Sequence, residues 1–122
     1  MNRPEQDMHK DIAKHIRARG VPGLVWWHTQ NGARYGGKNP AMHGAIMKSL
    51  GVRAGVSDFV FLYDGRFYAL ELKAIGGGNP TVEQLKFIDD VNNAGGFATC
   101  AKGLDLALKV LEAWGLVKGK AV

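Results

Sequence analysis

The residues with the clearest potential for chemistry lie on either side of a predicted hairpin turn. Asp58 precedes one apolar run, and Glu71 and Lys73 lie on a second apolar run after the dipeptide Asp64-Gly65. An Asp-Gly pair between two apolar runs is typical of a two-residue β-hairpin. With this turn, Asp58 faces Glu71 across the two strands, and Lys73 points to the same face of the sheet.

Two carboxylates that face each other across a sheet destabilise it. A divalent cation reverses this effect, because both carboxylates can ligate Mg²⁺ or Mn²⁺. A lysine beside them could orient a water nucleophile or offset the charge of a phosphate. In the alternative interpretation, Glu71 and Lys73 merely lie on the solvated face of an edge strand. The apolar residues around Glu71 instead indicate an inner strand, so the pattern predicts a cation site if the hairpin register holds.

This arrangement resembles a known nuclease signature. Asp58, with Glu71-Leu72-Lys73 on the next strand, is similar to the motif of the PD-(D/E)XK nuclease superfamily. The flanking segments Gly55-Val56-Ser57 and Thr81-Val82-Glu83-Gln84 extend the resemblance to the virus-type replication–repair nuclease (VRR-NUC) domain. The resemblance covers most of the chain. It implies one nuclease domain over residues 1–122, with an α/β restriction-endonuclease-like core in which helices flank a mixed central sheet.

The resemblance also implies a set of site residues. Asp58, Glu71 and the main-chain carbonyl of Leu72 would hold Mg²⁺ or Mn²⁺, and carbonyl ligation suits such hard cations. Glu5 would complete the acidic cluster from an N-terminal helix. Lys73 would position the water or stabilise the transition state.

Glu5 and Gln84 each have a second explanation. Glu5 lies one turn before Met8 on the apolar side of a helix expected over residues 3–19, but a first-turn acid also favours the helix dipole. Gln84 matches the glutamine of the family's nuclease motif, but Thr81 and Gln84 also form a capping-box pattern at the start of a helix. The sequence leaves both alternatives open.

Nucleic-acid contacts are predicted mainly in the glycine-rich loop 30–40. Arginine can clamp a phosphate, and tyrosine can stack on a base. The alternative is that this loop is an ordinary polar surface loop. For Arg53, which precedes the hairpin, the alternative is a surface arginine with no role in binding. The candidates for binding are Asn31, Arg34, Tyr35, Lys38 and Arg53.

The aromatic segment 24–29 predicts a strand. We expect Trp26 and Trp27 to pack in the core. His28 is more typical of a polar residue at a strand end than of a metal ligand.

The overall composition fits a small globular domain with a phosphate-bearing partner. The chain has 122 residues, a net charge of +5 and one cysteine, Cys100. A basic balance favours polyanions, and one cysteine excludes an internal disulfide and gives no support to a cysteine-based zinc site. The absence of an apolar leader or a long apolar run predicts a cytoplasmic protein that makes no membrane contact. The resemblance implies that the cell is bacterial or phage-infected.

The predicted function is that of a metal-dependent DNA endonuclease, structure-specific for branched, flapped or four-way DNA in replication, repair or recombination. The resemblance also implies a homodimer. Two alternatives remain open: a non-catalytic nucleic-acid-binding domain, and a sequence-specific restriction-type endonuclease of the same fold.

Overall fold

The computed structural model describes residues 3–29 and 39–119. Strands and helices alternate along most of the chain, which confirms the predicted α/β organisation. The elements in order are α1 (Arg3–Arg19), β1 (Val25–His28), α2 (Pro40–Ser49), β2 (Phe59–Tyr63), β3 (Arg66–Lys73), α3 (Val82–Asn93), β4 (Phe97–Lys102) and α4 (Leu104–Ala113).

The four strands form one mixed sheet in the order β1-β2-β3-β4. β2 is antiparallel to both of its neighbours, β1 and β3, whereas β4 runs parallel to β3 after the crossover through α3. β3 is therefore an inner strand, as its apolar sequence predicts.

The hairpin between β2 and β3 has the predicted turn and register. Asp64 and Gly65 both have positive φ angles, 51° and 73°, as a type I′ turn requires. Tyr63 pairs with Arg66, and Phe59 pairs with Leu70 at the other end of the ladder. Asp58 and Glu71 therefore occupy the next step, just beyond the paired residues.

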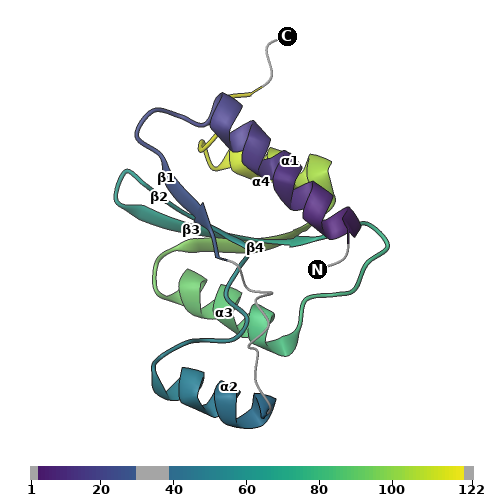
Figure 1. The fold of residues 1–122 in the computed structure, drawn as a ribbon. Coiled ribbons are helices and arrows are strands. Elements are labelled where there is room, and N and C mark those ends of the chain that lie inside the picture. Colours follow the sequence, from purple (N-terminus) through teal and green to yellow (C-terminus); the bar gives the residue numbers. More distant parts are fainter. Residues whose placement is uncertain (1–2, 30–38, 120–122) are drawn as a thin grey trace.

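Helices cover both faces of the sheet (Figure 1). α1 and α4 lie on one face, where the larger core includes Ile12 and Ile16 of α1 with Phe61 and Leu70 of the sheet. α3 lies on the other face, over a smaller core that includes Ile88. α2 stands apart and buries none of its residues. None of the helices in the described ranges is long and apolar enough to cross a membrane.

The two tryptophans of β1 have different environments. Trp26 packs toward the core, with its ring centroid 6.1 Å from that of Phe59. Trp27 points to the opposite face and is 50% exposed, so the prediction that it packs in the core is wrong. β1 is an edge strand, and in the described part of the chain α3 packs on β3 and β4 rather than on β1.

Candidate functional site

The predicted carboxylate pair lies at the end of the sheet, and both side chains are buried. Asp58 is 9% exposed and Glu71 only 2%. Asp58 immediately precedes β2, so its side chain is free to turn toward β3, where its Oδ2 accepts a hydrogen bond of 2.8 Å from the main-chain N–H of Leu72. This bond fixes one carboxylate beside the other.

Glu71 presents two chemically different oxygens. Its Oε2 accepts a hydrogen bond of 3.2 Å from Nε2 of Gln84 and lies 3.7 Å from Nζ of Lys73. Its Oε1 is buried and accepts no hydrogen bond from any described residue. Buried polar atoms are nearly always paired, so an unpaired carboxylate oxygen beside a second carboxylate fits a cation.

The electrostatics of the pair favour the same conclusion. Burial, together with the negative charge of Asp58, raises the pKa of Glu71 to about 8, and Lys73 acts in the opposite direction. A buried carboxylate loses its hydration and repels a like charge nearby. A bound cation would remove both penalties.

Gln84 both caps α3 and contacts Glu71. It closes the capping box of α3, in which its Oε1 accepts a 2.8 Å hydrogen bond from the N–H of Thr81 and its own N–H donates to the hydroxyl of Thr81. Its Nε2 remains available and donates to Glu71. The cap therefore orients the amide that holds the carboxylate.

Gly55 allows α3 to approach the site this closely. Its φ angle is +81°, and an added Cβ would lie 2.4 Å from the carbonyl carbon of Glu83 and 2.7 Å from the backbone nitrogen of Gln84. Only glycine tolerates both this backbone conformation and this contact. The segment before β2 thus lies directly against the first turn of α3.

Two histidines extend the site toward α1, and the sequence reasoning did not predict them as site residues. Nδ1 of His9 lies 2.9 Å from Nε2 of His28, and Nε2 of His9 lies 3.7 Å from Oδ2 of Asp58. One ligand atom from each of these three residues falls within 4.8 Å of the others. Burial lowers the pKa of His9, which favours the neutral imidazole that binds metals. Imidazole nitrogens suit transition ions such as Mn²⁺ better than Mg²⁺.

The remaining predicted residues have different places in the structure. Glu5 is half-buried in α1, one turn before His9, and its charge favours the protonated form of that histidine. Arg53 pairs with Asp90 of α3 at 2.6 Å and lies over the ring of Phe87. The other predicted nucleic-acid contacts, Asn31, Arg34, Tyr35 and Lys38, lie outside the described residues.

Comparison with known proteins adds one decisive similarity. No family model matches the sequence, and no curated protein does. A solved structure described as a "VRR_NUC domain protein" matches with a TM-score of 0.73, covering 100% of this chain and 97% of that one. The chain has the VRR-NUC fold. Sequence identity is 20%, so the likeness is one of fold, and at that level it confirms the resemblance drawn from the motifs. The VRR-NUC fold is consistent with the predicted restriction-endonuclease-like core.

Proposed function

We propose that this protein is a nuclease that hydrolyses phosphodiester bonds in DNA with the help of a divalent cation, Mg²⁺ or Mn²⁺. The main support is the buried pair Asp58 and Glu71. One oxygen of Glu71 contacts protein donors, and the other has no donor among the described residues. The VRR-NUC fold supports the proposal, because the similar solved protein carries the nuclease abbreviation in its name. The net charge of +5 suits a polyanionic substrate.

The residues divide the chemistry between them. A cation held by Asp58 and Glu71 would supply charge neutralisation at the phosphate and make water more acidic. The ammonium group of Lys73 orients the attacking water and stabilises negative charge as it develops. Gln84 keeps the Glu71 carboxylate in place. The carbonyl of Leu72 and the carboxylate of Glu5 are part of the proposal as additional ligands.

The test is cleavage of labelled single-stranded, duplex, flapped and four-way DNA in the presence of Mg²⁺, Mn²⁺ or EDTA. The parent is compared with Lys73→Ala and Asp58→Ala, and binding is measured in parallel. Cleavage that needs a metal, and that both substitutions abolish while binding survives, supports the proposal. The panel also tests whether branched or flapped DNA is preferred, as we propose.

The same experiment separates the two alternatives. Binding without cleavage under every metal condition would leave a non-catalytic DNA-binding domain. Cleavage at one sequence, irrespective of branching, would indicate a restriction-type endonuclease. The homodimer implied by the resemblance remains a prediction, and light scattering of the purified protein checks it.

A further inference from the structure

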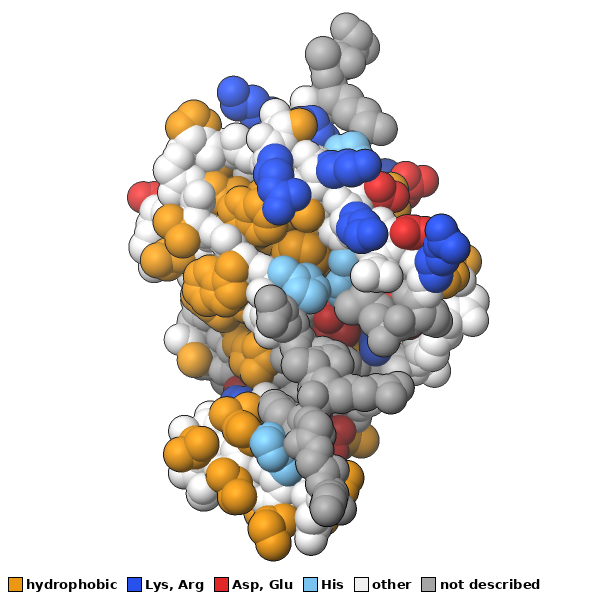
Figure 2. Space-filling view, in the orientation of Figure 1, with side chains coloured by type: hydrophobic (Ala, Val, Ile, Leu, Met, Phe, Trp, Pro, Cys, Tyr) orange, Lys and Arg blue, Asp and Glu red, His pale blue; other side chains and the backbone are white. Residues whose placement is uncertain are grey.

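A groove runs between α1 and the edge strand β1 and ends at the candidate site. Its volume is about 750 Å³, and His9 and His28 line it together with residues of both walls. His9 lies 3.7 Å from Asp58, so the groove adjoins the carboxylate pair through its histidine lining. Figure 2 shows Lys and Arg side chains gathered over α1, next to an apolar surface and histidines.

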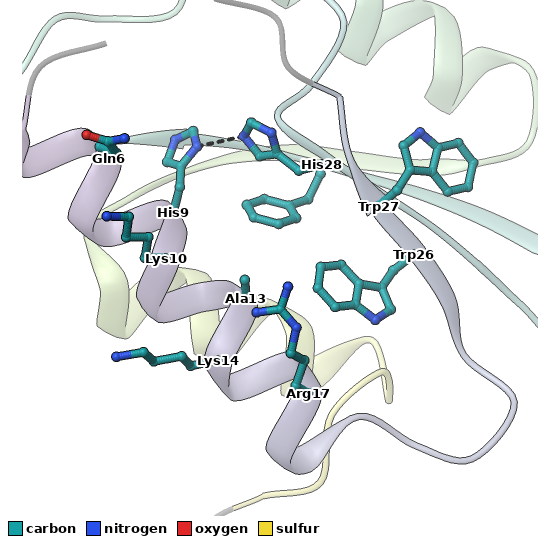
Figure 3. A pocket seen from close by; sticks show the side chains of 10 residues that line it. Gln6, His9, Lys10, Ala13, Lys14, Arg17, Trp26, Trp27 and His28 are labelled. Atoms are coloured by element: carbon teal, nitrogen blue, oxygen red, sulfur yellow. Dashed lines mark hydrogen bonds between the residues drawn. The ribbon is translucent and has the colours of Figure 1, made fainter.

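The wall formed by α1 is cationic. Lys10, Lys14 and Arg17 are exposed and line the groove from successive turns of the helix, as Figure 3 shows. At a rise of about 1.5 Å per residue they span about 10 Å, or about three phosphates at the axial spacing of one strand. None of these three forms an ion pair with a carboxylate in residues 3–29 and 39–119. Their charges are therefore available to an anionic ligand.

The opposite wall is aromatic. Trp26 of β1 points from this wall toward α1, whereas Trp27 points to the other face of the sheet and is half-exposed beside the free edge of β1 (Figure 3). The guanidinium of Arg17 lies 5.6 Å from the ring centroid of Trp26, which joins the two walls. Cations with an exposed aromatic ring nearby are the usual combination for unpaired nucleotides, since phosphates bind the cations and bases stack on the ring.

We propose that this groove binds a single-stranded segment of the nucleic acid whose scissile phosphate lies at Asp58 and Glu71; the proposal rests on the nuclease function proposed above. The size of the groove favours a single strand, because a volume of about 750 Å³ is that of a small-ligand pocket. A strand that leaves the groove past the free edge of β1 reaches Trp27, and a base can stack there only when it is unpaired. The preferred substrate therefore carries a flap or overhang beside the cleaved bond.

The test is binding of a labelled single-stranded oligonucleotide and of a blunt duplex of the same sequence, in EDTA so that no cleavage occurs. The variants are Lys10→Ala/Lys14→Ala, Trp27→Ala and Trp27→Phe. The matched control, Arg66→Ala/Lys109→Ala, removes two exposed positive charges that do not line the groove. Thermal unfolding confirms that each variant is folded, and the single-residue Trp27 variants test the groove if the double variant is not.

Each variant has its own expected result. Trp27→Ala weakens single-strand binding about 5- to 150-fold, as expected for the loss of one stacked base. It leaves the salt dependence unchanged, and Trp27→Phe retains most of the affinity. Lys10→Ala/Lys14→Ala makes the slope of log K against log salt about 1.4 units less steep, which is two phosphate contacts to a single strand. The control changes single-strand affinity by no more than about twofold.

The groove proposal would be overturned if the variants lost equal affinity for duplex and single strand, or if Trp27→Ala lost no affinity. A parent protein that binds neither DNA would also overturn it. Cleavage is scored separately with Mg²⁺ and Mn²⁺. A parent that binds single strands through these residues but never cuts would refute the nuclease function while leaving the groove as a binding site. A parent that cuts, with groove variants that bind normally, would refute the groove alone.

Discussion

Lys73 is the only cation that forms an ion pair with Glu71 among the described residues, and the two side chains lie 3.7 Å apart. Lys73→Ala should lower the cleavage rate about 100- to 1000-fold, the usual effect of losing one group that stabilises transition-state charge. Lys102 is a matched control, because it pairs with Lys73 in the β3–β4 register but is exposed and bonds to Asn79. Single-turnover rates of the two alanine variants check this, and equal losses would contradict the assignment of Lys73.

The raised pKa of Glu71 predicts an unusual pH dependence of stability. The ordinary value is 4.5 and the folded value is about 8, so between them the folded protein holds a proton that the unfolded chain has released. This bound proton therefore stabilises the folded state at low pH, and the stabilisation is lost as the pH rises through about 8. From about pH 6.5 to about pH 9 the metal-free protein should lose about 2 kcal/mol.

Denaturant titration in EDTA at several pH values measures this loss. Glu71→Gln should flatten the profile over this range, because the amide has no proton to lose. A variant profile that follows the parent's would show that another group causes the dependence. Below about pH 6.5 the lowered pKa of His9 acts in the opposite sense, so the comparison is confined to the higher range.

His9 should decide the metal preference of the site. Its imidazole and that of His28 lie beside Asp58, and nitrogen donors favour Mn²⁺ over Mg²⁺. His9→Ala should weaken Mn²⁺ binding about tenfold or more while leaving Mg²⁺ binding nearly unchanged. His15→Ala, on the same helix but outside the cluster, is the control. Calorimetric titration with each metal checks the result, and equal losses for both metals would contradict it.

At the scale of elements, the first turn of α3 has a structural and a chemical role that substitutions can separate. Thr81→Ala and Gln84→Ala each remove part of the capping box, which should cost about 1 kcal/mol of stability. Only Gln84→Ala also removes the donor to Glu71. We expect similar losses in unfolding free energy but a fall in cleavage rate with Gln84→Ala alone. Equal effects on rate would mean that α3 acts only through its stability.

The whole molecule brings the site together from five elements, one of which is β1 with His28. α1 supplies His9, the start of β2 supplies Asp58, β3 supplies Glu71, and α3 supplies Gln84. A cation that binds only this assembled arrangement stabilises the folded state by mass action, by about 2.7 kcal/mol at a hundred times its dissociation constant. Mg²⁺ or Mn²⁺ should therefore raise the melting temperature in a concentration-dependent way, as differential scanning fluorimetry would show.

Glu71→Gln is the control for that experiment, since it removes a charged ligand at nearly constant volume. The variant should be less responsive to either metal than the parent. An unchanged response would place the cation elsewhere.

The sequence by itself determined the features that depend on neighbouring residues. The Asp64-Gly65 dipeptide specified the hairpin and its register, the helical spacing of Met8, Ile12 and Ile16 specified the buried face of α1, and Thr81 with Gln84 specified the start of α3. These are signals of backbone conformation and periodicity that act within a few residues, and they were sufficient to place Asp58 beside Glu71.

Only the tertiary structure decided the contacts between distant segments. His9 and His28 meet because α1 packs over one face of the sheet, and neither residue carries a local signal for the other. Trp27 is exposed because β1 lies at the edge of the sheet, a position that strand order sets and its aromatic sequence does not. Arg53 contacts α3 because its guanidinium pairs with Asp90 and lies over the ring of Phe87. Such contacts depend on how whole elements pack, since burial and charge pairing join residues that the chain itself keeps apart.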